Sequence, residues 1–254
     1  MKIKLLKSYF FSILACVFFS SCSSNNTSNL TSAWDPIEPI NRAVFSFNMA
    51  VDTYTLEPVS KVYGYIVPEF LTNSLTRHFN WIKAPLSAIN SSIQGKHEEA
   101  FLTIANFSIN IFTLGFYDLT GGQSNSYEED FDQTLAMYNF TTGPYIMIPF
   151  LGPSTVRGLA GTLADGILDP LNLLGAEKIV EINSAELPIK AVHARSEYMD
   201  QINELKYESL DSYAVFRSVY FQRLNSQIND AENKDDNITD VNSGAIDAFF
   251  IHNQ

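Results

Sequence analysis

Cysteine is scarce in this sequence: Cys16 and Cys22 are the only two, and both lie close to the N-terminus. The rest of the chain can form no disulfide, so a folded domain has to be stabilised by its buried apolar side chains. Metal-binding and catalytic patterns are also missing. The four histidines have no second His or Cys at ligand spacing, and no glycine-rich phosphate loop or nucleophile elbow occurs. We therefore expect no metal, no cofactor and no enzyme activity.

One pair of acids remains as a catalytic candidate. Asp165 and Asp169 lie four residues apart on a predicted helix, a spacing that places two carboxylates on one face. An envelope hydrolase could use such a pair, but no nucleophile or metal ligand accompanies it. Because Pro170 follows directly, a role at the end of a helix is the favoured interpretation.

Positive charge is in short supply as well. Lysine and arginine total 16 against 28 acids, which gives a formal net charge of -12. A nucleic-acid-binding surface needs a basic stripe to replace the counterions of the phosphates, so no nucleic-acid partner is expected. Charged residues make up only 17% of the chain and hydrophobic residues 46%, a balance that allows a sizeable core.

The N-terminus has the pattern of an export signal. Three lysines precede the uncharged stretch from Ser8 to Phe19, which is too short to span a bilayer. Phe19-Ser20-Ser21-Cys22 then resembles a lipobox, the motif before an acylated cysteine. The sequence therefore predicts a lipoprotein signal peptide over residues 1–21 and lipid attachment at Cys22.

Cys16 is a competing attachment site. Ile13-Leu14-Ala15 precedes it and matches a lipobox better than the stretch with Phe19 does. Cleavage there would leave an apolar segment of only about eight residues, at the lower end of the usual range, so Cys22 is favoured. Ser23 follows the anchor in place of the Asp that retains lipoproteins in the inner membrane, and we expect the outer membrane.

The remaining chain divides by composition into three parts. Residues 22–33 are rich in Ser, Asn and Thr and are expected to form a flexible tether, and residues 230–254 read as an acidic, disordered tail. The part between them, 34–229, shows helical periodicity, so we expect an all-α fold. Its first apolar stripe is formed by Ile40, Val44, Phe47, Val51 and Tyr54, and after Glu186 an ordinary amphipathic helix places Arg195 and Glu197 on its polar face.

The stretch from Ala100 to Tyr117 contains no charge and carries a narrow polar stripe. Four polar residues are spaced three, four and three apart: Thr103, Asn106, Asn110 and Thr113. One interpretation is a central core helix whose polar groups find internal partners. The other is a helix whose wide apolar face meets lipid while the stripe lines a channel.

Residues 143–176 are also poor in charge and contain four prolines. The prolines divide the segment into pieces too short to cross a bilayer. Val156, Leu159, Leu163 and Ile167 form one apolar face, opposite the small and polar Gly158, Gly161 and Asp165. Short apolar helices of this kind suit a protein lying within a membrane, or a dense core.

Three stretches of this domain resemble the MlaA (VacJ) family of lipoproteins. They are the Asp-Pro and Asn-Arg signature near residue 35, the Gly-Pro-Tyr segment that begins at residue 143, and the Tyr-Phe-Gln-Arg segment near residue 220. The residues that carry the resemblance are Asp35, Pro36, Asn41, Arg42, Phe47, Asn48, Gly143, Pro144, Tyr145, Pro149, Gly152, Arg157, Tyr220, Gln222 and Arg223.

The resemblance implies a ring of short helices in the inner leaflet of the outer membrane. Such a protein would associate with a trimeric porin, and an amphipathic channel would pass mislocalised phospholipid from the outer leaflet to the periplasmic carrier MlaC. Its effect would be to maintain the lipid asymmetry of the outer membrane. An adaptor lipoprotein that binds a porin or an assembly machine without moving lipid is the alternative.

The resemblance also suggests roles for the polar stripe and the loop after it. The stripe becomes the candidate channel lining, with uncharged groups that could hold a headgroup weakly. A movable apolar loop could gate the opening, and its candidate residues are Gly115, Phe116, Tyr117, Gly121 and Gly122. A plain surface turn is the alternative for this loop.

Overall fold

The computed structural model describes residues 34–120, 128–169 and 176–228. The predicted signal peptide, Cys22, the tether and the acidic tail lie outside these residues. The elements are α2 (Glu38–Val51), η1 (Asp52–Leu56), α3 (Glu57–Ile66), α4 (Glu69–Ile93), α5 (His97–Ile109), η2 (Asn110–Thr113), α6 (Phe131–Met137), β1 (Tyr145–Ile148), β2 (Gly152–Thr155), α7 (Val156–Leu168), α9 (Ala176–Glu197), α10 (Met199–Asn203), η3 (Glu204–Glu208) and α11 (Ser212–Ile228). The predicted helical fold is confirmed. Within the described ranges no helix has both the length and the apolar character that a membrane crossing requires.

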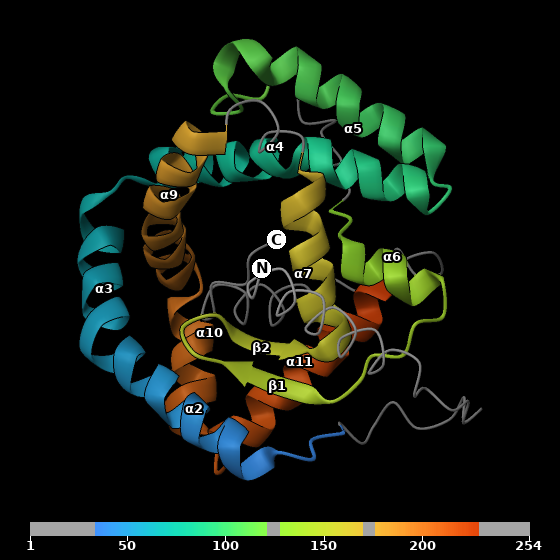
Figure 1. Ribbon diagram of the computed structural model, residues 1–254. Coiled ribbons are helices and arrows are strands. Elements are labelled where there is room, and N and C mark those ends of the chain that lie inside the picture. The colour runs from blue at the N-terminus through green and yellow to red at the C-terminus, as the bar shows by residue number, and fades with distance from the viewer. Residues whose placement is uncertain (1–33, 121–127, 170–175, 229–254) are drawn as a thin grey trace, which may run out of the picture. The chain divides into compact units, whose positions relative to one another are not determined.

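Within the unit that begins at Ala33, the helices contact one another along a closed path (Figure 1). Helix α3 packs against α9, which leads through α10 and η3 to α11. Helix α11 contacts α6, and α6 contacts α4, which directly follows α3 in the chain. Helix α5 packs along α4, and the β1-β2 hairpin connects α2 with α7.

The β-hairpin is a departure from the short helices expected between the prolines of residues 143–176. Strands β1 and β2 are antiparallel, with Tyr145 opposite Thr155 and Ile148 opposite Gly152. The turn places Phe150 and Gly152 in the left-handed region, with φ of 64° and 95°. An extended strand forms here because its open edge finds hydrogen-bond partners on α2, which the local sequence does not reveal.

Two asparagines of α2 provide those partners. The Asn41 side chain donates to the Tyr145 carbonyl at 3.0 Å and accepts from the Met147 amide at 2.9 Å. Asn48 does the same for the Ile148 carbonyl at 3.0 Å and the Phe150 amide at 2.9 Å. Seven residues of helix rise about 10.5 Å, and three residues of strand rise about 10 Å. The two amides therefore act as a neighbouring strand for β1.

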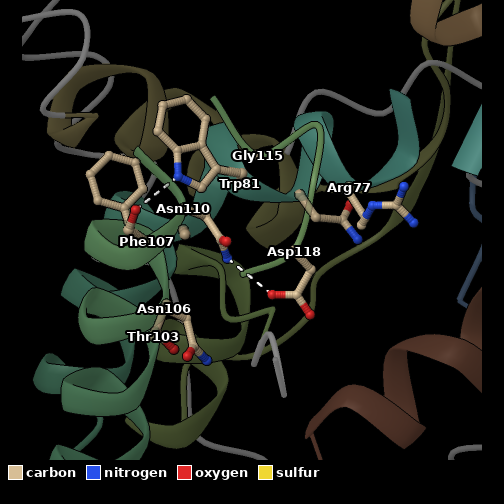
Figure 2. A pocket seen from close by; sticks show the side chains of 10 residues that line it. Arg77, Trp81, Thr103, Asn106, Phe107, Asn110, Gly115 and Asp118 are labelled. Atoms are coloured by element: carbon tan, nitrogen blue, oxygen red, sulfur yellow. Dashed lines mark hydrogen bonds between the residues drawn. The ribbon is translucent and has the colours of Figure 1, made fainter. Parts of the chain in front are cut away.

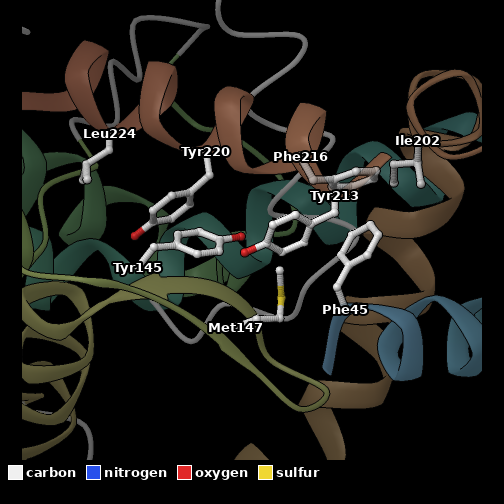
Figure 3. Packing of buried hydrophobic residues seen from close by; sticks show 8 residues of the cluster. All are labelled: Phe45, Tyr145, Met147, Ile202, Tyr213, Phe216, Tyr220 and Leu224. Atoms are coloured by element: carbon white, nitrogen blue, oxygen red, sulfur yellow. The ribbon is translucent and has the colours of Figure 1, made fainter. Parts of the chain in front are cut away.

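A compact aromatic core lies between α2, β1 and α11 (Figure 3). Phe45 packs edge-on against Tyr213 at 5.6 Å between ring centroids, and Tyr145 packs similarly against Tyr213 at 6.2 Å. Such tilted pairs add attraction beyond area burial. The remaining buried members of the cluster are Met147, Ile202, Phe216, Tyr220 and Leu224.

Outside this core, several helices bury polar residues and expose apolar ones. Helix α2 buries Asn41 and Asn48 but leaves Ile40 62% and Phe47 45% exposed. On α7 the predicted apolar face is also the outer one, since Leu163 is 64% and Ile167 74% exposed. The predicted amphipathic periods are present in both helices, but the polar face is the inner one. This inversion suits an apolar surrounding rather than water.

The predicted polar face after Glu186 is wrong for Arg195. This guanidinium is fully buried and donates to Asp52 at 2.8 Å and to Asn203 at 2.6 Å. Lys206 adds bonds to Asp52 at 2.6 Å and to Glu57 at 3.1 Å. The network joins the two π-helical segments η1 and η3, and its acids come from a part of the chain too distant for a helical pattern to show.

Candidate functional site

The residues that carry the family resemblance gather around the hairpin and α11. Asp35 accepts hydrogen bonds from Asn41 at 2.8 Å, from Arg217 at 2.7 Å and from the Tyr213 hydroxyl. Arg42 binds Asp211 through both guanidinium ends, at 3.0 and 2.7 Å. These contacts fix α2 against α11, so this part of the motif builds the frame of the domain.

The middle motif is fixed in the same way. Arg157 donates to Asp132 at 2.6 Å and to the Phe140 carbonyl at 3.1 Å, and both charged side chains are largely buried. Gly143 has a φ of 75°, and a Cβ there would lie 3.0 Å from Val156. The other motif residues on the hairpin and α11 are Pro144, Pro149, Gly152, Tyr220, Gln222 and Arg223. Burial lowers the pKa of Arg223, although nearby acids oppose this.

A cavity of about 260 Å³ lies between α4 and α5 (Figure 2). Three residues of the predicted polar stripe line it, namely Thr103, Asn106 and Asn110. Thr113 is not among the lining residues; its hydroxyl donates to the Asn110 and Tyr117 carbonyls at 3.0 and 2.7 Å. Gly115 of the predicted gating loop also lines the cavity. The sequence period did not reveal the other lining residues, which are Arg77, Asn80, Trp81 and Ala84 of α4, Phe107 of α5 and Asp118 of the loop after η2.

Thr103 is the most unusual residue of the lining. Its side chain is 2% exposed, and its hydroxyl has no hydrogen-bond partner among the described residues. A buried hydroxyl without a partner costs roughly 1–3 kcal/mol. Such groups are rare in folded proteins, and beside a cavity a ligand or a water molecule can complete the bonding.

Asn106 and Asn110 differ in the hydrogen bonds that their side chains make. The Asn110 side chain accepts from the Leu119 amide at 2.7 Å and donates to Asp118 at 3.3 Å, so it fixes the loop after η2. The half-buried Asn106 makes no side-chain hydrogen bond to another described residue. Of these two asparagines, it is Asn106 that therefore offers its whole amide to the cavity.

An aromatic wall closes one side of the cavity. The Trp81 ring stacks on Phe107 at 4.8 Å and donates from its indole nitrogen to the Phe107 carbonyl at 3.0 Å. Gly115 packs against Trp81 so closely that a Cβ would lie 2.3 Å from the tryptophan Cβ, and its φ is 74°. This position therefore tolerates only glycine.

The described half of the predicted gating loop is attached to α4. His78 stacks on Phe116 at 4.1 Å and donates to the Leu114 carbonyl at 2.6 Å. Arg77 donates to the Phe116 carbonyl at 3.3 Å, whereas Tyr117 is 66% exposed. Gly121 and Gly122 lie outside the described residues, and the gating role stays a prediction.

A smaller cavity of about 30 Å³ adjoins the first and shares Asn80, Ala84 and Thr103 with it. Its remaining lining is Lys83, Leu86, Ser87, Glu128, Glu129, Asp130 and Asp165. Burial raises the pKa of Asp165, although Asn90 donates to its carboxylate at 3.0 Å. Its second oxygen accepts from the Phe131 amide at 3.1 Å, while Asp169 is the C-cap of α7. Both acids thus have structural roles.

The outer face of α5 is apolar and exposed. Phe101 is 72% and Phe112, in the following η2 turn, 91% exposed. A central core helix would bury these side chains, so that interpretation of the stretch is wrong. The segment instead separates a polar cavity on one side from an apolar surface on the other.

Comparison with known proteins gives a consistent result. The model of the family described as MlaA lipoprotein matches residues 33–227. A relative from Haemophilus influenzae, named intermembrane phospholipid transport system lipoprotein MlaA, is 29% identical over 87% of this chain and 90% of its own. A relative of the same name from Escherichia coli is 28% identical over 87% of this chain and 88% of its own.

A solved structure, described as "Structural basis for maintenance of bacterial outer membrane lipid asymmetry", is similar as well. It aligns with a TM-score of 0.67 and 27% sequence identity. The alignment covers 76% of this chain and 98% of that one. Sequence motifs, helical fold and family match agree, and this chain belongs to the MlaA lipoprotein family.

Proposed function

We propose that this protein removes mislocalised phospholipid from the outer leaflet of the outer membrane and passes it to a periplasmic carrier. Family membership supports this, because the relatives are named as lipoproteins of a phospholipid transport system. The single observation that carries the proposal is the inverted arrangement of α4 and α5. A polar cavity lies directly inside an apolar surface exposed at Phe101 and Phe112, and the Thr103 hydroxyl in its lining has no hydrogen-bond partner within the described part of the chain.

This arrangement fits the physical problem of moving a phospholipid. A headgroup needs polar groups wherever it leaves water, while the acyl chains need apolar surroundings. Asn106 and Thr103 offer neutral hydrogen-bonding groups, which hold a headgroup without trapping it. Transfer along such a path makes or breaks no covalent bond, so we propose a transporter without catalytic activity.

The location and partners belong to the same proposal. Acylation of Cys22 would anchor the protein in the inner leaflet of the outer membrane, and the exposed apolar residues of α5 and α7 would contact acyl chains. A trimeric porin would hold the protein at that depth, and the soluble carrier MlaC would collect the lipid on the periplasmic side.

The test is complementation in a Gram-negative strain that lacks its own family member. Expression of the full chain should lower the phospholipid content of the outer leaflet and restore detergent resistance. Lipid should also copurify with the protein from mild detergent at a defined stoichiometry. A protein that binds a porin but carries no lipid and leaves the outer leaflet unchanged would instead be an adaptor.

A further inference from the structure

We propose that the cavity between α4 and α5 receives the headgroup of a zwitterionic aminophospholipid, with the ammonium end innermost and the phosphate at Arg77. This inference rests on the proposed function and specifies which headgroup the site prefers. Three observations carry it: the order of charges along the cavity, the Thr103 hydroxyl at its inner end, for which the described residues provide no partner, and the volume of the cavity.

The charged residues along the cavity follow the order that would match the phosphate and ammonium of the headgroup. Of the lining residues of the larger cavity, Arg77 is the only charged one that is exposed, so its guanidinium marks the rim. The inner end adjoins the smaller cavity, whose lining holds four acids and one lysine: Glu128, Glu129, Asp130, Asp165 and Lys83. Lys96 pairs with Glu129, and Arg223 interacts with Asp130 and Glu128, so that with Lys83 three cations stand against the four acids. In an aminophospholipid the phosphate lies next to the glycerol and the ammonium lies at the far end.

Asp118 strengthens the same preference. Its carboxylate lines the larger cavity and is held in place by the Thr120 amide at 2.9 Å and by Asn110. An ammonium inside the cavity would be attracted by this carboxylate and by the acids behind Thr103. A headgroup with a negative charge and no amine would meet the same acids at a cost.

Thr103 links the two cavities and supplies the polar contact. Thr103 is in the lining of both spaces, and its buried hydroxyl has no partner among the described residues, so it has the capacity to accept a hydrogen bond from an ammonium group. The volume of about 260 Å³ lies just below the usual range for drug-sized ligands. It therefore suits a headgroup, while the acyl chains remain outside with the exposed apolar residues of α5.

The experiment uses Trp81 as a reporter in the full-length, detergent-solubilised protein. The chain has two tryptophans, so Trp34→Phe leaves Trp81 alone in the cavity wall. Its fluorescence is titrated with dihexanoyl phosphatidylethanolamine, dihexanoyl phosphatidylglycerol and free phosphoethanolamine. The ethanolamine lipid should bind about tenfold more tightly than the glycerol lipid, the effect of one charge-assisted contact.

Two variants test which residue contacts the phosphate and which contacts the ammonium of the headgroup. Arg77→Gln should weaken both lipids by about tenfold, because both contain the phosphate. Thr103→Val should remove the preference for ethanolamine without lowering the melting temperature, because it deletes a hydroxyl that no described protein group uses. Thr53→Val, at an exposed position of η1, is the control and should change neither property.

Equal affinity for the two lipids, or an unchanged preference in Thr103→Val, would overturn this inference. Free phosphoethanolamine binding as tightly as its lipid would also overturn it, because the site would then serve a soluble phosphoester. These results would leave the proposed function standing if the chain still restored the outer leaflet. Failure to bind any phospholipid and to restore the leaflet would contradict the proposed function itself.

Discussion

At the scale of single residues, the two α2 amides replace a missing strand. Asn41→Ala would leave the buried Tyr145 carbonyl and the Met147 amide without partners. The expected loss is about 2 to 4 kcal/mol in the free energy of unfolding, measured by chemical denaturation in detergent. Asn73→Ala, on the exposed surface of α4, should change it little. Equal stability of the two variants would show that the hairpin does not depend on Asn41.

A second residue, Asp130, makes the free energy of unfolding depend on pH. Burial raises its pKa to about 6, above the usual value of 3.8, although the Gln133 amide donates to it at 2.7 Å. A carboxyl with a raised folded pKa takes up its proton more readily when folded, so its contribution to stability increases as pH falls through 6.

The variant Asp130→Asn isolates this contribution, because asparagine caps a helix as well as aspartate does. Between pH 7 and pH 5, the unfolding free energy of the unmodified protein should rise by about 1 kcal/mol relative to the variant. Parallel curves for the two proteins would show that Asp130 stays ionised in the folded state.

At the scale of elements, α5 and η2 carry two asparagines with different roles. Asn106→Leu removes an amide without described protein partners, so protein abundance should stay normal while outer-leaflet phospholipid rises. Asn110→Leu breaks the contacts to Asp118 and Leu119 and should cost roughly 1–3 kcal/mol per lost partner, lowering abundance. Immunoblots and lipid analysis of the same cells separate these effects. Normal asymmetry with Asn106→Leu would exclude a transport role for this amide.

The outer face of α7 can be mapped with single cysteines. Leu159 and Leu163 are exposed in the protein, so cysteines there should be protected from a water-soluble thiol reagent in membranes and become reactive in detergent. Cysteines at Glu197 and Glu204, on exposed polar positions, should react in both conditions. Rapid labelling at Leu163 in intact membranes would place this face in water.

The sequence revealed the helical periods but not which face of each helix points into the protein. The four-residue spacing of α7 and the polar stripe of α5 were both visible, because each repeats within one helix. The side that faces inward was left open, because an apolar face on either helix fitted a buried core as well as a surface that meets lipid. The hairpin, the buried Arg195 and the α4 half of the cavity depend on contacts between residues far apart in sequence, and no local pattern contains them.

At the scale of the whole molecule, the anchor decides where the protein works. Cys22→Ser should leave the precursor without lipid and outside the outer membrane, whereas Cys16→Ser should have little effect. Metabolic labelling with a fatty acid, followed by membrane fractionation, measures both outcomes. Loss of labelling in Cys16→Ser alone would move the predicted cleavage site, and recovery with the inner membrane would contradict the expected location.

The exposed apolar surface also determines how the stability of this protein has to be measured. In plain buffer the exposed side chains of α5 and α7 would bring molecules together, and association would remove them irreversibly. A melting experiment without detergent would then report a rate that depends on concentration and heating speed. The chain can associate in the same way between its synthesis and its arrival at the membrane. The fraction that reaches the membrane therefore depends on how short a time its apolar side chains stay exposed to water.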